Sequence, residues 1–277
     1  TGKMGAAIAL RFAETGHDLT LWNRTPSRAE VLGVGRLATS PADAVGGAGL
    51  VVSCLTGPEA LRTTFGGPSG ALAAARGQLF VEMSTAGPDV VAELAPQVAA
   101  SGSTLVDIPI IATPPVVQRG AALLVAGGAD DDVARATSLL EPLGEVRHVG
   151  PLGSGARLKL VANSMVGVVS MAGAELQVAG EAAGLDPEVV FSILVRLAPS
   201  LEARREGFLR GSHEPALFAV GDLRKDLDLG LGMFHDAGRP VPVTGLVREL
   251  VAGEVAEDAG RDVSAVIRRY RQPPDGG

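Results

Sequence analysis

The sequence predicts an N-terminal domain with a mainly parallel, doubly wound α/β sheet, joined by a long helix to an all-α C-terminal domain. Two observations lead to this fold class. Over the first 150 residues, short apolar β-type runs alternate with stretches of helical period, which is typical of βαβ units. Beyond that point the strand pattern stops and helical periods continue. The chain has 277 residues, enough for two domains, which we place at 1–150 and 151–277.

The predicted strands of the first domain are short runs rich in Val, Leu, Ile and Thr. They lie at 18–23, 50–54, 79–82, 104–108, 121–126 and 146–149. The segments between them are rich in alanine and have helical spacing. We expect helices at 4–15, 41–45, 58–64, 88–100 and 130–140.

The second domain begins with one long predicted helix at 153–184, a stretch without proline. Further helices are predicted at 187–197, 201–209, 219–237 and 243–260. The seam between the domains is expected at 150–155. The last residues, 269–277, contain two prolines and two glycines and are expected to be frayed.

The composition excludes several classes of partner. A net charge of −7 argues against nonspecific binding to nucleic acid. The longest uncharged stretch, 160–174, is too short to cross a bilayer, so no membrane partner is expected. The single cysteine, Cys54, excludes an intrachain disulfide and fits a reducing, cytoplasmic location.

The chain opens on Thr1-Gly2-Lys3-Met4-Gly5, directly before a predicted helix. Gly2 and Gly5 match the last two glycines of G-x-G-x-x-G, the Rossmann pattern in which the start of a helix approaches a pyrophosphate. We therefore expect Gly2, Lys3 and Met4 to contact a dinucleotide. The first glycine of the pattern and the strand before it are expected upstream of Thr1.

Asn23-Arg24-Thr25 follows the first predicted strand and indicates which dinucleotide binds. Rossmann units that bind NAD place Asp or Glu about 20 residues past the glycines, on the adenosine ribose. No carboxylate stands here, whereas Arg24 can pair with a 2′-phosphate and Thr25 can donate a hydrogen bond to it. The sequence therefore predicts NADP(H) in preference to NAD(H). An ordinary solvated arginine beside a turn is the alternative.

Leu55-Thr56 and Ser84-Thr85 each follow a predicted strand. Ligands of open α/β sheets bind outside the carboxyl ends of the strands. We therefore expect Leu55, Thr56 and Thr85 to contact the cofactor. Cys54 also ends a strand, but a lone cysteine with apolar flanks is usually a small buried filler, and we assign it no chemistry.

Seven short segments occur in one order along almost the whole chain. They are TGKMG (1–5), GHDLTLWNRT (16–25), VEMSTAGP (81–88), DIPI (107–110), GSGARLKLVAN (153–163), KDLDLGL (225–231) and DVSAV (262–266). Together they resemble the β-hydroxyacid dehydrogenase family, which includes 3-hydroxyisobutyrate dehydrogenases and glyoxylate or succinic semialdehyde reductases. The resemblance implies a small carbonyl or hydroxyacid substrate. It also implies an all-α domain that forms the contact of a homodimer or homotetramer.

In this resemblance Lys159 takes the place of the family's catalytic lysine, and Asn163 that of its partner asparagine. Residues four apart lie on one helix face, so both can hold the same small substrate. A buried lysine without a role is costly. An ammonium aimed at a carbonyl oxygen would stabilise the alkoxide that hydride transfer creates and then protonate it. The alternative is a lysine that extends to solvent beside a structural asparagine.

Lys225 matches the family's second lysine, which implies a contact with the cofactor or substrate. Its neighbour Asp226 points about 100° away on a helix, so we interpret Asp226 as structural. A solvated lysine in the charged segment GDLRKDLD is the alternative.

The chain departs from the family where the substrate carboxylate is implied to bind. Family members usually carry Ser-Gly-Gly there, and this chain has Ile111-Ala112-Thr113, followed by two prolines. Ile111 has no hydroxyl, and prolines have no N–H to donate. These three residues are still expected to line the substrate, which is then bulkier or more apolar.

These observations predict an NADP(H)-dependent oxidoreductase that interconverts a small aldehyde or ketone and its alcohol, with Lys159 as general acid and base. One alternative is an imine reductase, although members of that class usually carry another residue in place of this lysine. A second is an NADP-binding module without turnover. The four histidines are dispersed, so no metal is expected.

Overall fold

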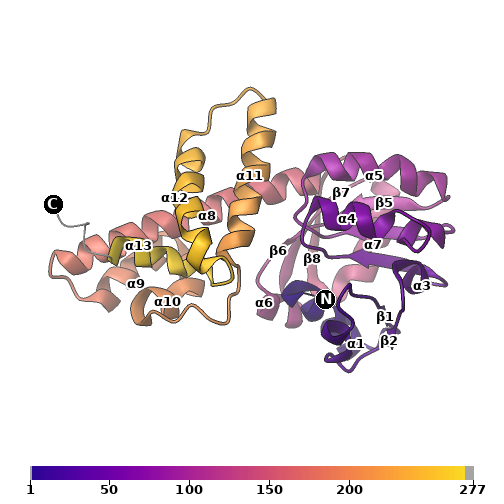
Figure 1. The fold of residues 1–277 in the computed structure, drawn as a ribbon, viewed down its shortest axis with the longest axis horizontal. Helices are drawn as coiled ribbons and strands as arrows, with labels where there is room; N and C mark the ends of the chain where they lie inside the picture. The colour runs from indigo at the N-terminus through magenta and orange to yellow at the C-terminus, as the bar shows by residue number, and fades with distance from the viewer. Residues whose placement is uncertain (1, 272–277) are drawn as a thin grey trace. The chain divides into compact units, whose positions relative to one another are not determined.

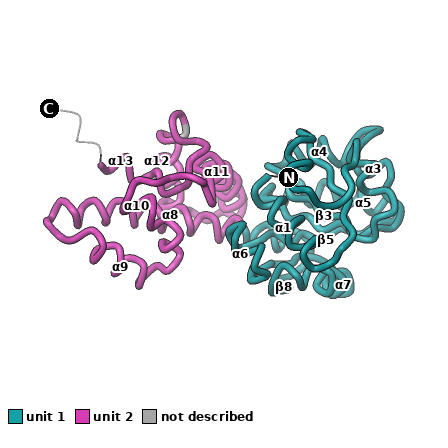
Figure 2. The backbone as a smooth tube through the Cα atoms, turned by 90° about the horizontal axis from the view of Figure 1, so that it is seen from below, with its two compact units in different colours: residues 1–159 teal, residues 160–277 magenta. Residues whose placement is uncertain are grey.

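The computed structural model describes residues 2–271, apart from the side chain at position 255, and the chain divides into two compact units. Unit 1 comprises residues 1–159 and unit 2 residues 160–277 (Figure 2). The long helix α8 (Ser154–Ala182) contributes to both units, because the boundary falls directly after Lys159.

Unit 1 is built from short strands that alternate with helices (Figure 1). Its strands are β1 (Thr20–Leu21), β2 (Arg36–Leu37), β3 (Leu50–Ser53), β4 (Leu79–Glu82), β5 (Thr104–Asp107), β6 (Ile110–Ile111), β7 (Ala122–Gly127) and β8 (Gly144–Gly150). Its helices are α1 (Lys3–Glu14), α2 (Ser27–Glu30), α3 (Pro41–Val45), α4 (Pro58–Phe65), α5 (Pro88–Ala100), α6 (Pro114–Gln118) and α7 (Asp130–Leu140), with 3₁₀ turns η1 (Ala71–Ala73) and η2 (Glu141–Leu143).

Six of these strands form one sheet in the order β3-β4-β5-β7-β6, and β8 also pairs with β7. β3, β4 and β5 run parallel, as do β7 and β8, whereas β7 runs antiparallel to β5 and β6. β1 and β2 form a separate parallel pair. The predicted fold class, a mainly parallel α/β sheet followed by an all-α region, is confirmed.

A cavity of about 570 Å³ lies between the two sheets of unit 1. Residues 17–22, on and around β1, line one side of it, and residues 46–55, on and around β3, line the other. Among the described strands, β1 bonds only to β2, and β3 only to β4. The cavity therefore lies along the remaining edges of β1 and β3.

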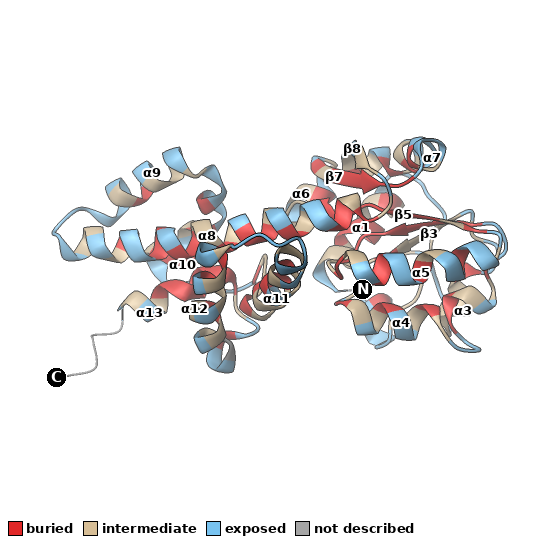
Figure 3. Cartoon of the chain, turned by 90° about the horizontal axis from the view of Figure 1, so that it is seen from above, coloured by how far each residue is buried: buried red, intermediate tan, exposed pale blue. Residues whose placement is uncertain are grey.

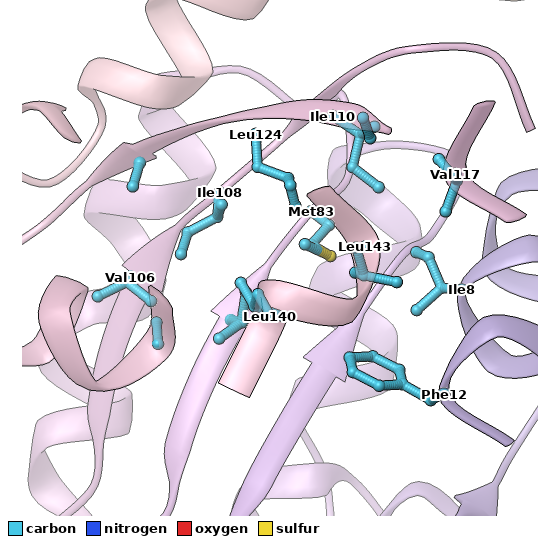
Figure 4. Close-up of a cluster of buried hydrophobic side chains, with 14 of the residues drawn as sticks. Ile8, Phe12, Met83, Val106, Ile108, Ile110, Val117, Leu124, Leu140 and Leu143 are labelled. Atoms are coloured by element: carbon cyan, nitrogen blue, oxygen red, sulfur yellow. The ribbon is translucent and has the colours of Figure 1, made fainter. Parts of the chain in front are cut away.

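Apolar side chains pack on both faces of the six-stranded sheet, and β4 shows why. Successive side chains of a strand point to opposite faces. Leu79 and Val81 join the cluster that includes residues of α1 and α7, whereas Phe80 joins the cluster with residues of α4 and α5. Figure 4 shows the first cluster, in which Ile8 and Phe12 from α1 converge with side chains of the strands and of η2. A strand buried on both faces therefore has a continuous apolar run.

Four short strands and α-helices of unit 1 were not predicted. α2, β2, β6 and α6 contain only two to five residues each, too few for a period to appear. α6 begins at Pro114-Pro115, because proline is favourable in the first turn, where the N–H needs no partner. The strand predicted at 18–23 is limited to Thr20–Leu21.

The regular elements in the described part of unit 2 are helices, apart from one antiparallel bridge between Ala219 and Asp262. After α8 come α9 (Pro187–Leu197), η3 (Pro199–Arg204), α10 (Arg205–Arg210), α11 (Val220–Asp236), α12 (Pro242–Asp258), η4 (Val263–Val266) and α13 (Ile267–Arg271). Figure 3 shows α8 with buried and exposed residues interspersed along its length. Within the described residues, no helix combines the length and the apolar character that crossing a bilayer requires. The helix predicted at 201–209 is in fact two elements, η3 and α10.

The prediction that residues 269–277 are frayed is wrong for 269–271. These residues end α13, and Arg271 donates hydrogen bonds to the carboxylate of Glu181 at 3.0 Å and to the carbonyl oxygen of Phe208 at 2.6 Å. Residues 272–277 lie outside the described residues.

Candidate active site

The start of α1 forms the first part of the predicted dinucleotide site. Gly2 is the N-cap, and the first turn contains no acidic residue that would repel a phosphate. A Cβ on Gly2 would meet no described atom within 4 Å. A Cβ on Gly5 would lie 3.8 Å from the carbonyl oxygen of Cys54, an ordinary contact that places the start of α1 beside the end of β3.

The loops that follow β3 and β4 meet at the same edge of the sheet. The N–H of Leu55 donates a hydrogen bond of 2.8 Å to Oγ of Ser84. Thr56 is exposed and Thr85 is half-buried, each shortly before a helix whose first residue is a proline. The structure therefore brings these predicted cofactor residues together with the start of α1.

A tight turn follows β1. The side-chain amide of Asn23 donates a hydrogen bond of 2.8 Å to the carbonyl oxygen of Thr25, which closes the turn. Arg24, between them, is exposed to solvent together with Thr25. The side chain of Asn23 thus has a structural contact that was not predicted, and Arg24 is accessible to a ligand.

Lys159 lies against the segment predicted to line the substrate. Its Nζ donates a hydrogen bond of 2.6 Å to the carbonyl oxygen of Ile110, which is 3% exposed. Ile111 pairs with Leu123 in the sheet, and Thr113 is the N-cap residue of α6. Ile111, Ala112 and Thr113 are half-buried. The ammonium is thus bonded within unit 1, beside these residues, rather than extended into water.

In unit 2, Asp226 connects two of the predicted site residues. The side-chain amide of Asn163 donates a hydrogen bond of 2.6 Å to one oxygen of Asp226, and Nζ of Lys225 lies 2.5 Å from the other. Asn163 is 6% exposed and Asp226 2%. This link is not predictable from the directions of the Cβ atoms alone, because a lysine side chain is long enough to fold back onto its neighbour.

Two buried carboxylates in unit 1 were also missed. Glu82 ends β4 and Asp107 ends β5, and they are paired in register across the two strands. Burial raises the pKa of Glu82 to about 7 and that of Asp107 to about 6. Glu82 accepts hydrogen bonds from the hydroxyl of Ser53 and from the N–H of Ser84. The sequence feature that could have identified Glu82 and Asp107 is their position at the ends of predicted strands.

Cys54 has no feature of a nucleophile. It packs against the apolar cluster of unit 1, and burial raises the pKa of its thiol to about 12, so the thiol stays protonated near neutral pH. Among the residues that the structure describes, no group of three or more His, Cys, Asp or Glu side chains could hold a metal ion.

Both halves of the chain match known families. Residues 1–153 match the NAD binding domain of 6-phosphogluconate dehydrogenase, and residues 153–270 match the NAD-binding family of NADP-dependent 3-hydroxyisobutyrate dehydrogenase. The chain belongs to the β-hydroxyacid dehydrogenase family. These enzymes are NAD(P)-dependent oxidoreductases. The two family matches confirm the resemblance seen in the sequence.

Curated relatives with different names match this chain. Glyoxylate/succinic semialdehyde reductase 2, chloroplastic, from Arabidopsis thaliana is 26% identical over 98% of this chain and 77% of its own length. The cytokine-like nuclear factor N-PAC of Danio rerio is 27% identical over 97% of this chain and 60% of its own length. The human N-PAC is 26% identical, and the chain spans 50% of its length. The chain thus spans about half the length of the N-PAC relatives.

Solved structures share the fold. Mycobacterium tuberculosis 3-hydroxyisobutyrate dehydrogenase with L-serine has a TM-score of 0.85 at 23% identity, over 98% of this chain and 97% of that one. Psf3 in complex with NADP⁺ and 2-OPP has a TM-score of 0.88 at 20% identity, over 97% of each chain. A reductive aminase from Aspergillus terreus in complex with NADPH4, cyclohexanone and allyl amine has a TM-score of 0.61 at 23% identity, over 98% of this chain and 96% of that one.

Proposed function

We propose that this protein is an NADP(H)-dependent oxidoreductase that interconverts a small aldehyde or ketone and its alcohol, of the β-hydroxyacid or semialdehyde class. The observation that carries the proposal is the position of Lys159. Its ammonium bonds to the carbonyl oxygen of Ile110, directly before the segment proposed to line the substrate. A small carbonyl compound against Ile111–Thr113 would therefore have a proton donor beside it.

The basic residues of the chain support a chemical role for this lysine. Of the 24 basic residues, 21 are arginine and only three, Lys3, Lys159 and Lys225, are lysine. Arginine keeps its proton at any physiological pH, whereas lysine can release and regain one. All three lysines lie in segments that carry the resemblance to the family. In a chain that otherwise uses arginine, a lysine at position 159 fits a step that moves a proton.

The described residues fit a bound dinucleotide. The first turn of α1, with Gly2, Lys3 and Met4, offers backbone N–H groups to a pyrophosphate without a carboxylate nearby on the helix. Asn23, Arg24 and Thr25 would meet the adenosine ribose and its 2′-phosphate. Leu55, Thr56 and Thr85 would contact the rest of the dinucleotide. When bound, the reduced nicotinamide supplies a hydride.

The residues of the chain then complete the reaction. In the reductive direction the Lys159 ammonium donates a hydrogen bond to the carbonyl oxygen, stabilises the negative charge that develops there and transfers a proton to it. In the oxidative direction the neutral amine accepts the proton of the hydroxyl group. Asn163 lies one turn further along α8, and its bond to Asp226 fixes the amide that would orient the substrate.

Steady-state kinetics of Lys159→Ala and Lys159→Arg test the proposal. NADPH oxidation would be followed with succinic semialdehyde, glyoxylate, a panel of other aldehydes and ketones, and a cyclic imine. We expect kcat to fall by a factor of about 10² or more in both variants, because an arginine cannot serve as the acid, with the Kd of NADPH little changed. Val161→Ala is the control, because Val161 is 46% exposed on the same helix and should retain full activity. An unchanged rate in Lys159→Ala would overturn the proposal.

The N-PAC relatives favour a second candidate, an NADP-binding module without turnover, because their name is not that of an oxidoreductase. The same experiment separates the two. A module of this kind would bind NADPH but oxidise it with none of the carbonyl compounds or imines, and Lys159→Ala would change only its stability. A preference for the cyclic imine would instead identify an imine reductase.

A further inference from the structure

The buried carboxylate of Asp107 is bonded to the beginning of α8, the helix that carries Lys159. Asp107 is 1% exposed. One of its oxygens accepts a hydrogen bond of 2.6 Å from the N–H of Gly153, and the other accepts one of 2.6 Å from the N–H of Ala156. The N–H groups at the start of a helix have no partner within the helix, and its dipole favours a negative charge there. Asp107, at the end of β5, accepts hydrogen bonds from two of these N–H groups and places a negative charge at the start of α8.

Two glycines allow this close approach. A Cβ on Gly127 would lie 2.4 Å from an oxygen of Asp107, and a Cβ on Gly155 would lie 2.4 Å from the carbonyl oxygen of Val125. Real Cβ atoms do not come so near to an oxygen, so a larger residue at either position would displace the helix. The first turn of α8 is therefore packed directly against the ends of β5 and β7.

The same segment also binds the head of Lys159. Lys159 follows Gly155 by four residues and Ala156 by three, so it lies one turn of α8 beyond the residues that pack against β5 and β7. Its Nζ bonds to the carbonyl oxygen of Ile110, three residues beyond Asp107. The backbone of the helix and the ammonium it carries are thus both attached to residues 107–110.

We propose that Asp107 is a positioning residue for Lys159: its carboxylate fixes the first turn of α8 against β5 and thereby holds the ammonium beside Ile111–Thr113. This inference rests on the proposed role of Lys159 in proton transfer. A carboxylate accepts through both oxygens, whereas an amide of the same shape accepts through only one. Asp107→Asn therefore removes one of the two bonds to the helix with almost no change in volume.

Kinetics of Asp107→Asn form the first half of the test. We expect kcat for the preferred carbonyl substrate to fall roughly 10- to 100-fold, the scale on which small misplacements of a catalytic group act, with KM for NADPH unchanged. In the Lys159→Ala background the same substitution should cause no further loss of the residual rate. If Asp107→Asn lowered kcat by the same factor in the parent protein and in Lys159→Ala, the effect would be generally structural and the proposal would be overturned. A rise in the KM for NADPH as large as the fall in kcat would overturn it as well.

The second half of the test does not depend on turnover. Reductive methylation with ¹³C-formaldehyde labels only three lysines in this chain, and a Lys159→Arg sample assigns the signal of Lys159. We expect this signal to move in Asp107→Asn, while the signals of Lys3 and Lys225 stay in place. Asp186→Asn is the control, because Asp186 bonds to the exposed start of α9 in unit 2 and should leave all three signals unchanged. A fixed Lys159 signal would refute positioning even if Lys159 itself proves catalytic.

A titration of the unsubstituted protein keeps the proposal testable if Asp107→Asn does not fold. Burial raises the pKa of Asp107 to about 6, and the charged groups near it are Glu82 on β4 and Arg157 on α8. Protonation of Asp107 removes an acceptor, so the Lys159 signal should show a step near pH 6. The step should persist in Glu82→Gln, which excludes Glu82 as its source. Absence of the step, or its loss in Glu82→Gln, would overturn the proposal.

Discussion

The side-chain amide of Asn163 donates a hydrogen bond of 2.6 Å to the carboxylate of Asp226. The same carboxylate accepts a hydrogen bond of 2.5 Å from the ammonium of Lys225. Two residues that the sequence marks as functional, on α8 and α11, therefore depend on one buried acid. The amide of Asn163 can donate to Asp226 and still present its oxygen elsewhere. Asp226 thus fixes which end of the Asn163 amide would face the substrate proposed above.

Asp226→Asn should destabilise unit 2. The substitution places a second amide against that of Asn163 and removes the charge that partners Lys225, so buried polar groups lose their acceptors. We expect the free energy of unfolding to fall by about 2–4 kcal/mol in urea titrations. Asp222→Asn is the matched control, because Asp222 is exposed on the same helix and its substitution should change stability by no more than about 0.5 kcal/mol. Equal stability of the two variants would contradict a stabilising role for Asp226.

Arg24→Ala should weaken the preference for NADPH over NADH. Arg24 is exposed on the turn closed by Asn23 and Thr25, where a 2′-phosphate is proposed to bind. Loss of a charge-assisted bond of about 1.5–3 kcal/mol should raise the KM for NADPH roughly 10- to 100-fold and leave that for NADH unchanged. Arg28→Ala, on the exposed side of the following helix, should alter neither constant. A parallel loss with both cofactors would count against the 2′-phosphate contact.

The fold was largely predictable, because its longer elements have strong local signals. α5 begins at Pro88 and α9 at Pro187, and both helices have the bounds that the sequence predicts. A proline in the first turn and an apolar period are enough to define such helices. β6 was not predictable, because two residues show no period and its pairing with β7 depends on residues more than ten positions away.

In the candidate site, too, the residues in a local sequence motif were predictable and their long-range contacts were not. Lys159 and Asn163 were recognised from a segment that is contiguous in sequence. Their partners, the carbonyl oxygen of Ile110 and the carboxylate of Asp226, lie 49 and 63 positions away. Asp107 and Glu82 became neighbours only through the register of β4 with β5. Contacts of this kind arise from the packing of elements, which a local pattern does not specify.

Glu82→Gln should make stability less dependent on pH. The pKa of Glu82 is raised from 4.5 to about 7, chiefly by burial. Between these values the folded protein holds a proton that the unfolded chain has released, so the free energy of unfolding falls as pH rises through this window. The variant lacks this titration. Between pH 5 and pH 8 its free energy of unfolding should therefore fall by on the order of 2–3 kcal/mol less than that of the parent protein.

Urea unfolding at the two pH values measures this difference. Glu59→Gln is the control, because the side chain of Glu59 is 87% exposed and its removal should leave the pH dependence of the parent protein. In Glu82→Gln the free energy of unfolding should still fall somewhat as pH rises, since the pKa of Asp107 is also raised. An identical slope in the parent protein and in Glu82→Gln would show that Glu82 does not hold a proton in the folded state.

Gly207→Ala should destabilise unit 2 through one close contact. Gly207 lies on α10, and a Cβ there would be 2.1 Å from Oγ of Ser264 and 2.9 Å from Nδ1 of His213. These two side chains are buried and bonded to each other at 3.0 Å. Alanine would separate them, and we expect the free energy of unfolding to fall by roughly 2–3 kcal/mol.

Gly245→Ala provides the matched control for Gly207→Ala, because Gly245 is also helical but a Cβ on it would meet nothing within 4 Å. Alanine is a better helix former than glycine by about 1 kcal/mol, so this variant should be as stable as the parent protein or more stable. Thermal and urea unfolding of the two variants would be compared side by side. If Gly207→Ala matched Gly245→Ala in stability, α10 would have to move away from Ser264 at little cost, and the close packing of α10 against η4 would not contribute to the fold.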